Sequence, residues 1–373
     1  MATFEVKKKW TSDGAAVEDS NMALVGSDLD KEARKAAASN EAAWAEAGKE
    51  PGIQIWRVEK MKIVEWPKQE YGKFYMGDSY IVLHTRKDPG SDKLLWDIHF
   101  WLGKTTTQDE MGVAAYKTVE LDDFLDQAPI QHREVQQHES QQFTKIFKQI
   151  EYWDGGIDSG FNKVEAGAYT TKLLRVRKLK HTIKVAEMPC TRDSLNAGDC
   201  FILDTGTALY PWFGEEASAF EKAKAGTVAH NISNKRHGKC KVVNEIDADF
   251  WAALGGEGPV KSAAEGEDHV DEDVGEGILY KLSDETGKLM CTEVGRGDLT
   301  KSMLGSDDVY ILDAGIEVFV YIGGNASDAE YRSAMSTAVS YCGTTEKPLW
   351  TPIHVFKEGT TITNELWKNI FSN

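Results

Sequence analysis

Gly198-Asp199-Cys200-Phe201-Ile202-Leu203-Asp204 is the stretch that decides the fold, because variants of it occur at two other places in the chain. These variants are Gly77-Asp78-Ser79-Tyr80-Ile81-Val82-Leu83 and Asp307-Asp308-Val309-Tyr310-Ile311-Leu312-Asp313. Each copy places an acid in a turn before a run of β-branched and aromatic residues, a pattern that predicts a buried strand.

The same companions follow each copy of this stretch. An aromatic-apolar-glycine triplet comes first, and a glutamate stands nine residues after each aromatic. The triplets are Trp101-Leu102-Gly103, Trp212-Phe213-Gly214 and Tyr321-Ile322-Gly323, and the glutamates are Glu110, Glu221 and Glu330. A repeat of about 110 residues is too long for a solenoid unit and predicts three tandem domains.

Length and composition indicate an ordinary soluble protein of two or three domains. The chain has 373 residues, of which 41% are hydrophobic and 28% charged. Its net charge of −17 argues against nucleic acid as a partner, because no excess of Lys and Arg is present to displace counterions from phosphate. No apolar run reaches the roughly 18 residues of a membrane-spanning helix. Residues 1–9 lack the apolar core of a secretory signal.

The repeats and the composition between them divide the chain into five regions. We predict an N-terminal extension over 1–48, domains over 49–169, 170–256 and 278–373, and an acidic linker over 257–277. The extension should contain a helix from Asp28 to Ala47 that lies on the first domain through Trp44 and other apolar residues.

Each domain should contain one long and one short helix among its strands. The long helices are expected at 108–125, 219–233 and 328–341, with the first the longest. Strands that alternate with such helices predict an α/β (α+β) fold, in which a central mixed sheet lies between a long and a short helix.

The three glutamates allow two interpretations that spacing alone leaves open. Each closes a capping box, which begins at Thr107, Ser218 or Ser327, and a glutamate there binds a backbone N–H at the helix start. However, each repeat also supplies an aspartate before a neighbouring strand, which a capping box does not require. Carboxylates and turn carbonyls are the hard oxygen ligands that Ca²⁺ takes, although no EF-hand loop is present.

Taken together, these motifs resemble the gelsolin/villin superfamily. The segments similar to its first repeat are 52–59, 77–83, 108–110, 131–135 and 156–161, and those similar to its second and third repeats are 198–204 and 310–313. The resemblance covers about 49–373, with three gelsolin-like domains, and is greatest to the short members severin and fragmin. It implies a calcium-dependent protein, not an enzyme, that severs actin filaments, caps their barbed ends and in some members nucleates new ones.

The resemblance also implies a calcium site in each repeat, built on the residues identified above. The implied ligands are Gly77, Asp78, Glu110 and Ile157 in the first repeat, Gly198, Asp199, Glu221 and the linker residue Asp268 in the second, and Asp307, Asp308 and Glu330 in the third. A further site, shared with actin, would use Asp122 and the carbonyls of Gln127 and Pro129. Gln and Pro stand there in place of the usual Gly and Ala, and backbone ligands should tolerate this change.

The helix at 108–125 is expected to bind actin. Tyr116, Glu120 and Asp123 share one exposed stripe, while Val113, Ala114 and Leu121 supply core contacts on the opposite side. Alone, such a stripe is typical of a solvated face. The resemblance places this helix in a cleft of actin, a helix-in-groove mode, and adds Phe161 to the contact.

A basic cluster in the second domain is the remaining candidate site. It comprises Lys172, Arg175, Arg177, Lys178 and Lys180. It could be the solvated side of a strand, but the resemblance implies binding to the filament side and to phosphoinositides. An alternative function is therefore a calcium-dependent phosphoinositide-binding cytoskeletal adaptor that severs weakly.

Cysteine usage predicts reduced thiols in a cytoplasmic protein, and with the resemblance we expect a cytoskeletal protein that is a monomer in the absence of actin. The five cysteines are scattered and contain no C-x-x-C pair. The resemblance implies a disulfide from Cys200 in secreted relatives, but Phe213 occupies the partner position, so that bridge cannot form. Motifs of hydrolases, P-loop proteins and zinc proteases are absent from the sequence, and its nine histidines show no pairing with a nucleophile.

Overall fold

The computed structural model describes residues 3–5, 38, 41–59, 62–156, 170–178, 182–236, 239–266, 275–283, 290–326, 328–345 and 347–371. Its contacts divide the chain into two compact units. The first unit comprises Met1–Gln69, Ser79–Phe143 and Asp271–Asn373, and the second comprises Glu70–Asp78 and Thr144–Val270. Elements of the first and third repeats thus share one unit, while the domain boundaries given above remain predictions.

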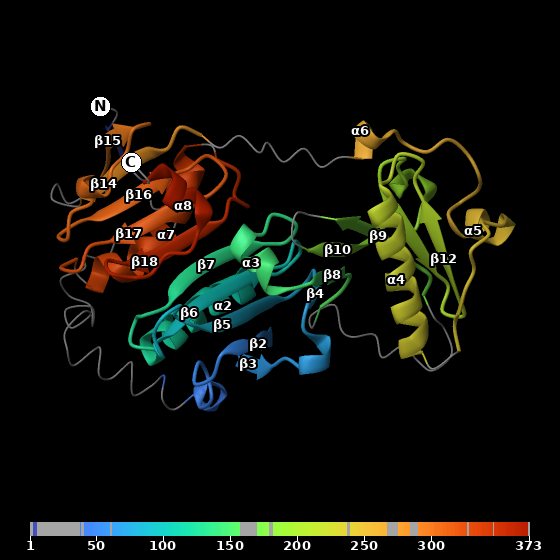
Figure 1. The fold of residues 1–373 in the computed structure, drawn as a ribbon, viewed down its shortest axis with the longest axis horizontal. Coiled ribbons are helices and arrows are strands. Elements are labelled where there is room, and N and C mark those ends of the chain that lie inside the picture. The colour runs from blue at the N-terminus through green and yellow to red at the C-terminus, as the bar shows by residue number, and fades with distance from the viewer. Residues whose placement is uncertain are drawn as a thin grey trace. The chain divides into compact units, whose positions relative to one another are not determined.

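The first unit contains an eleven-stranded sheet in the order β1-β15-β14-β16-β17-β18-β7-β6-β5-β2-β3 (Figure 1). Its strands are β1 (Thr3–Glu5), β2 (Gly52–Glu59), β3 (Lys62–Glu65), β5 (Ser79–Lys87), β6 (Leu94–Leu102), β7 (Ile130–Val135), β14 (Ile278–Ser283), β15 (Met290–Arg296), β16 (Val309–Asp313), β17 (Val318–Ile322) and β18 (Ile353–Lys357). The first and third repeats join where β7 pairs antiparallel with β18, with His132 opposite His354.

The second unit contains a seven-stranded sheet in the order β13-β12-β11-β9-β10-β8-β4. Its strands are β4 (Lys73–Tyr75), β8 (Gln149–Trp153), β9 (Lys172–Lys178), β10 (Ile183–Met188), β11 (Cys200–Asp204), β12 (Ala208–Phe213) and β13 (Lys241–Val242). β4 and β8 come from the range predicted for the first domain. They extend this sheet because β8 pairs parallel with both β10 and β4.

Each repeat has one helix of 17 residues and one of six. The long helices are α2 (Gln108–Phe124), α4 (Ala219–Lys235) and α7 (Asp328–Thr344), and the short ones are α3 (Gln141–Ile146), α5 (Ala248–Ala253) and α8 (Glu365–Ile370). The remaining helical segments are α6 (Ala263–Gly266) in the predicted linker and the 3₁₀ turns η3 (Ala42–Trp44), η4 (Lys68–Glu70), η5 (Arg192–Ser194) and η6 (Lys301–Met303). The expectation that the helix at 108–125 would be the longest is wrong. A 17-residue helix is about 25 Å long, and each long helix packs across the strands of its own repeat.

The two helices of a repeat cover opposite faces of its sheet, as β11 shows. Cys200 and Ile202 point into a core with α4, whereas Phe201 and Leu203 pack with Phe250 of α5. β16 repeats the arrangement between α7 and α8. All five residues of β11 are buried, because side chains alternate along a strand and both faces of this one are covered. The predicted fold class is confirmed.

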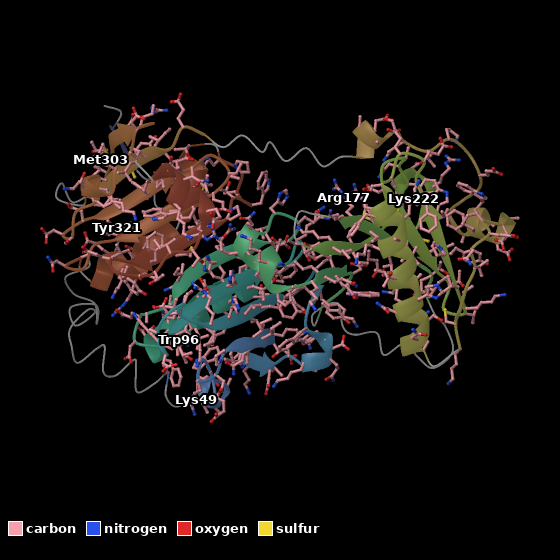
Figure 2. All side chains as sticks on the ribbon, viewed as in Figure 1. Lys49, Trp96, Arg177, Lys222, Met303 and Tyr321 are labelled. Atoms are coloured by element: carbon pink, nitrogen blue, oxygen red, sulfur yellow. The ribbon has the colours of Figure 1, made fainter. Side chains whose placement is uncertain are left out.

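The end of the N-terminal extension lies on the first repeat, as expected for Trp44. This fully buried indole meets Trp56 edge to face, with ring centroids 5.0 Å apart. Trp96 Nε1 donates to the Gly48 carbonyl at 2.9 Å and fixes the segment that carries Lys49 (Figure 2). Most of the predicted helix from Asp28 to Ala47 lies outside the described residues. Of the helices in the described part of the chain, none is long and apolar enough to cross a membrane.

The register of β11 and β12 gives a direct test of the fold. Cys200 lies opposite Phe213. In the next pair along the two strands, Asp199 and Gly214, the Gly214 N–H donates to the Asp199 carbonyl at 2.9 Å. Cys200 and Phe213 are therefore a non-hydrogen-bonded pair, whose Cα atoms lie about 4.5 Å apart, within the range of a disulfide.

We expect Phe213→Cys to form a disulfide with Cys200 under mild oxidation. Closing a loop of this size should stabilise the second unit by about 3 kcal/mol. Thiol titration and thermal unfolding with and without reductant measure both effects. Phe220→Cys, at an exposed position on α4, is the control and should remain a free thiol. A free thiol in oxidised Phe213→Cys would show that the register is wrong.

Candidate functional sites: the repeated acids and helix α2

Asp199 of the second repeat lies in the turn before β11, and its buried carboxylate is surrounded by donors. Arg175 Nε donates to Oδ2 at 2.7 Å, and Asn196 Nδ2 donates to the same oxygen at 2.8 Å. Arg177 Nε lies 3.3 Å from Oδ1. The Gly198 N–H binds Asn196 Oδ1 at 2.9 Å, which fixes the turn. Asp199 is thus paired with two cations of β9.

Glu221 of the same repeat caps α4, as the capping-box interpretation predicts. Its Oε2 accepts the Ser218 N–H at 3.1 Å and the Ser218 hydroxyl at 2.8 Å. Its Oε1 accepts the backbone N–H of Lys178 at 3.3 Å. A carboxylate has about four lone-pair sites, and Glu221 uses three of them here, so about one is left for a cation.

The third repeat places its acids in the same positions. Asp308 Oδ1 pairs with Lys281 Nζ at 2.9 Å, and Asp307 Oδ1 accepts from Asn325 Nδ2 at 2.7 Å. Glu330 is half-buried in the first turn of α7. The residue that would complete its capping box, Ser327, lies outside the described residues.

The predicted ligands of the first repeat belong to both units. Gly77 and Asp78 lie in the second unit. Asp78 Oδ1 lies so close to Gly156 that a Cβ atom at that position would be only 2.6 Å away, so the site requires a glycine there. Glu110 lies in the first unit, where its Oε2 accepts from Thr106 Oγ1 at 3.0 Å and from the Thr107 N–H at 3.3 Å. Its capping box is complete. The predicted site residues Ile157, Phe161, Lys180 and Asp268 lie outside the described residues.

A cation recurs at one position of the sheet in all three repeats. Arg57 lies opposite Tyr80, Arg175 opposite Phe201, and Lys281 opposite Tyr310. Each of these partners stands two residues after the acid of its repeat. Sequence reasoning missed this cation, although the patterns Trp56-Arg57-Val58, Leu174-Arg175-Val176 and Tyr280-Lys281-Leu282 carry a signal for it.

Of the three residues on α2 that were predicted to form an exposed actin-binding stripe, only Tyr116 is exposed. The Tyr116 side chain is 66% exposed, and the core contacts of Val113, Ala114 and Leu121 are confirmed. Glu120 is half-buried rather than exposed, because Trp44 Nε1 donates to it at 2.8 Å. Asp123 is also half-buried and accepts from Gln127 Nε2 at 3.0 Å.

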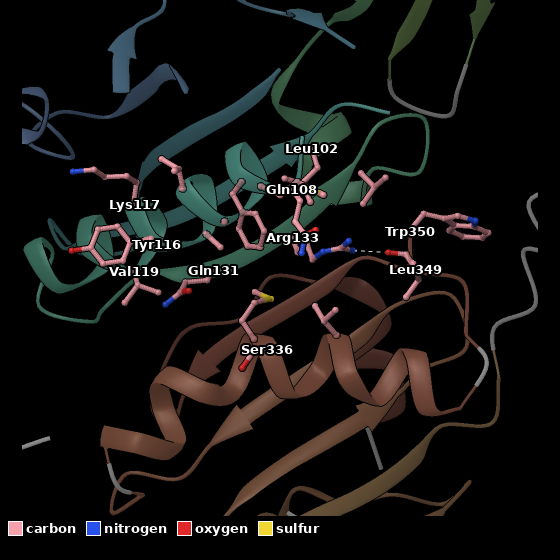
Figure 3. A pocket seen from close by; sticks show the side chains of 18 of the residues that line it. Leu102, Gln108, Tyr116, Lys117, Val119, Gln131, Arg133, Ser336, Leu349 and Trp350 are labelled. Atoms are coloured by element: carbon pink, nitrogen blue, oxygen red, sulfur yellow. Dashed lines mark hydrogen bonds between the residues drawn. The ribbon is translucent and has the colours of Figure 1, made fainter. Parts of the chain in front are cut away.

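A groove of about 2020 Å³ runs between α2 and α7 within the first unit (Figure 3). Its lining includes all three residues of the predicted stripe on α2 and Met335 and Ser336 on α7. Met335 packs against the cluster of Val113 and Ala114. At one end of the groove, Arg133 Nη1 donates to the Leu349 carbonyl at 2.8 Å. The third repeat therefore lies alongside α2.

Asp122 is fully buried and bonded to the third repeat. Its Oδ2 accepts the Tyr331 hydroxyl of α7, and burial raises the pKa of its carboxyl group to about 7. Gln127, predicted to offer a carbonyl, has a left-handed backbone with φ of 56°, and its side chain accepts from Lys357 Nζ. Pro129 is buried beside it.

A buried polar network, invisible in the sequence, lies on β6, β7 and β18. His132 Nδ1 lies 2.6 Å from His354 Nδ1, and its Nε2 lies 3.0 Å from Asp97 Oδ1. His99 Nδ1 lies 2.8 Å from Glu134 Oε1. Burial lowers the pKa of His99 to about 3 and of His132 to about 4, and raises that of Glu134 to about 7.

Potential ligand atoms of His99, His132 and Glu134 all lie within 4.8 Å of one another. The rings of His99 and His132 are stacked, however, with centroids 4.2 Å apart and planes 14° apart. An imidazole binds a metal through a lone pair in its ring plane, and two nearly parallel planes do not meet at one ion. The arrangement fits a hydrogen-bonded network better than a metal centre.

The predicted basic cluster is paired in this structure. Lys172 Nζ lies 2.9 Å from Glu187 Oε2, both arginines contact Asp199, and Lys178 Nζ lies 4.5 Å from the ring centre of Phe220. All five cysteines are free thiols.

The family model for the gelsolin repeat matches residues 60–144, 181–248 and 292–364. The chain belongs to the gelsolin family. It contains three gelsolin repeats, as the resemblance predicted.

Relatives of two lengths match this gelsolin-family chain. Gelsolin of Drosophila melanogaster is 42% identical over 85% of the chain, which spans only 42% of that protein. Gelsolin-like protein 1 of Lumbricus terrestris is 41% identical, with 96% of this chain and 97% of the relative covered. Severin of Echinococcus granulosus is 40% identical, with 89% and 91% covered.

We expect the histidine network to make the stability of the first unit depend on pH. Because the pKa of His132 falls from 6.5 in the unfolded chain to about 4 in the folded one, the unfolded state binds an extra proton between these values. The His132 contribution to the free energy of unfolding should therefore decrease as the pH falls from about 6.5 to 4. The raised pKa of Glu134 acts in the opposite direction below about pH 7.

Subtracting the free energy of unfolding of His132→Gln from that of the wild type, by urea titration at each pH, isolates the histidine contribution. His230→Gln, at an exposed position on α4, is the control, because it removes a histidine that does not belong to the buried network. If the free energy of unfolding of the wild type minus that of His132→Gln does not change from pH 7 to pH 4, the prediction is contradicted.

Proposed function

We propose that this chain is a calcium-dependent actin-binding protein that severs filaments and caps their barbed ends, and that it also nucleates assembly. The observation that carries the proposal is helix α2, which presents the exposed Tyr116 at the edge of a groove. Two relatives of similar length support it by name. One is severin, and the other is "Actin depolymerising venom protein gelsolin 1" of Platymeris rhadamanthus, 41% identical over 84% of this chain.

The activity would be non-covalent, and we propose no enzymatic step. Helix α2 would enter a hydrophobic cleft of actin through Tyr116 and Asp123, with the groove-side apolar residues excluding water. Its 17 residues form about five turns that such a cleft could receive. Binding energy gained between actin subunits would then break the filament, and a severing protein that stays bound would cap the new end.

Calcium would be the activating ion. In the second and third repeats, a turn carbonyl, the aspartate just before the strand and the glutamate in the first turn of the long helix could supply oxygen ligands of the type Ca²⁺ takes. These residues are Gly198, Asp199 and Glu221, and Asp307, Asp308 and Glu330. The acids Asp78, Glu110 and Asp122 extend the same proposal to the first repeat and to the site shared with actin. Bound calcium would supply positive charge that ties strand to helix.

The first unit has the features of a resting state in which the third repeat restrains α2. The Tyr331 hydroxyl donates to the Asp122 carboxylate, and Met335 packs against Val113 and Ala114 of α2. In addition, β18 pairs with β7. Actin could not receive the whole face of α2 while α7 lies alongside it. A ligand that moves an equilibrium from 1:99 to 99:1 must favour one state by about 5.5 kcal/mol. Several calcium sites acting together would supply such a difference.

A second candidate function, binding to phosphoinositides, rests on the basic cluster of β9. Lys178 and Lys224 both lie beside the exposed ring of Phe220, and cations around an aromatic ring suit an anionic lipid surface. Replacing Lys172 and Lys178 by glutamine distinguishes the two functions: loss of vesicle binding with intact severing would make the lipid role accessory. The free thiols fit action in the cytoplasm on the cytoskeleton, as a monomer in the absence of actin.

We expect Asp199→Asn combined with Glu221→Gln to weaken calcium activation. The wild type should shorten filaments in calcium and leave them long in its absence, as measured by fluorescence microscopy. The double variant should need more than about tenfold higher free calcium, the factor that corresponds to 1.4 kcal/mol, because both carboxylates of one site are lost.

Asp193→Asn combined with Glu216→Gln removes the same charge from exposed positions of the second repeat and should behave as the wild type. Unchanged calcium dependence in the Asp199 and Glu221 double variant would refute the role given to this site. Failure of the wild type to shorten filaments at any calcium concentration would refute severing itself.

We expect Tyr331→Phe to lower the free calcium needed for half-maximal severing. The substitution removes the hydroxyl that joins α7 to Asp122 and so takes one hydrogen-bond donor from that buried carboxyl group, which favours separation of the repeats. Tyr341→Phe is a matched control on the same helix, because its hydroxyl bonds to Asp313 within the third repeat at 2.8 Å. Equal thresholds in the wild type and Tyr331→Phe would exclude this contact as a restraint.

A further inference from the structure

In the second and third repeats, the cation that recurs on the strand contacts the acid proposed to bind calcium. In both repeats the cation and the acid lie within one unit. Arg175 Nη2 lies 2.6 Å from Asp199 Oδ2, with both side chains 9% exposed. Lys281 Nζ lies 2.9 Å from Asp308 Oδ1, with exposures of 39% and 29%. Arg177 adds a second guanidinium to Asp199. The pairing therefore recurs at the same position of the sheet in the second and third repeats.

These cations and a calcium ion would compete for the same oxygen atoms. Ca²⁺ takes six to eight oxygen ligands, whereas Asp199 Oδ2 already accepts from Arg175 and Asn196, and Oδ1 faces Arg177. A divalent ion placed beside two guanidinium groups would also be repelled. That repulsion is weakly screened because the acid and Arg175 are almost buried. Calcium can enter only if the arginines withdraw.

We infer that Arg175 and Arg177 in the second repeat, and Lys281 in the third, are built-in competitors of calcium that set the calcium affinity of their repeats. At low calcium each cation neutralises the negative charge of its acid and so helps to keep the turn before the strand folded. At high calcium the ion replaces it. The inference rests on the proposed calcium sites and adds to them the residues that determine the threshold.

The two repeats should differ in how strongly the cation competes. Asp199 faces two arginines in a nearly buried site, and Arg175 Nη2 is further held by the Gly266 carbonyl. Asp308 faces one lysine, which is more exposed and whose single ammonium group moves away at little cost. Removing an arginine at Asp199 should therefore change calcium affinity more than removing the lysine at Asp308.

Arg177→Gln in the full chain tests the inference, because Arg177 is only half-buried and its loss should not prevent folding. Bound calcium is measured by equilibrium dialysis against a series of buffered free calcium concentrations. We expect one bound calcium to shift to about tenfold lower free concentration, within the 5- to 150-fold span of typical couplings between sites. Arg175→Gln should shift it in the same direction, Arg177→Lys should restore the wild-type value, and Lys281→Gln should give a smaller shift in a second calcium.

Two controls separate competition from a general effect of charge. Lys172→Gln removes one positive charge from the same strand, but Lys172 pairs with Glu187 rather than Asp199, so the affinity should stay close to that of the wild type. In an Asp199→Asn background, which should bind one calcium fewer, Arg177→Gln should have no further effect, because the shared partner is gone.

The outcomes distinguish failure of this inference from failure of the proposed function. If Asp199→Asn loses no calcium, the second-repeat site itself is wrong. If Asp199→Asn loses one calcium but Arg177→Gln and Arg175→Gln leave its affinity unchanged or weaken it, the site stands and the competitor role is overturned. A shift of the same size in Lys172→Gln would also overturn it.

Discussion

The structure depends on strands that are apolar on both faces and therefore need a cover on each side. Within β11, alternate residues pack against α4 and α5, so neither helix could be removed without exposing half of the strand. The covers leave the edges of each sheet unpaired, and exposed edges bind other strands readily. The last strand of the second repeat, β13, has only two residues. Its counterparts β7 and β18 are longer and pair with each other.

That pairing gives the first unit a junction that is buried but polar. His132 and His354 face each other across it, and Asp97, Glu134 and Glu317 surround them. Tyr331 adds a hydroxyl bonded to Asp122. Hydrogen bonds contribute modest net stability, whereas unmet buried polar groups are costly. A junction of this kind holds one register firmly, yet separates at less cost than an apolar core, since its groups can bind water once exposed. This is what a restraint on α2 requires if it is to be released.

The sequence was sufficient for the features that recur at fixed spacing. The capping boxes of Glu110 and Glu221 and the strand at Cys200 are local or repeated, whereas the opposition of Cys200 to Phe213 followed from the family resemblance. The recurring cation was not predicted because its distance from the acid varies. Arg57, Arg175 and Lys281 precede their acids by 21, 24 and 27 residues, an interval that depends on hairpin length. The histidine network joins β6, β7 and β18, so only sheet order could reveal it. Glu120 was expected to be exposed because the sequence indicates that Trp44 packs on the first domain but not that its Nε1 donates to Glu120.

Electrostatics explains why the same acid can serve two states. The positive N-terminus of α4 already attracts Glu221. This attraction and the capping bond stabilise the carboxylate in the state without calcium. Asp199 is attracted by two arginines in that state. Both carboxylates are thus neutralised before calcium arrives, and the ion gains only the difference between its own attraction and theirs. A reduced net affinity suits a switch, because the ion can then leave when the calcium concentration falls, whereas the same acids without these partners would hold it more tightly.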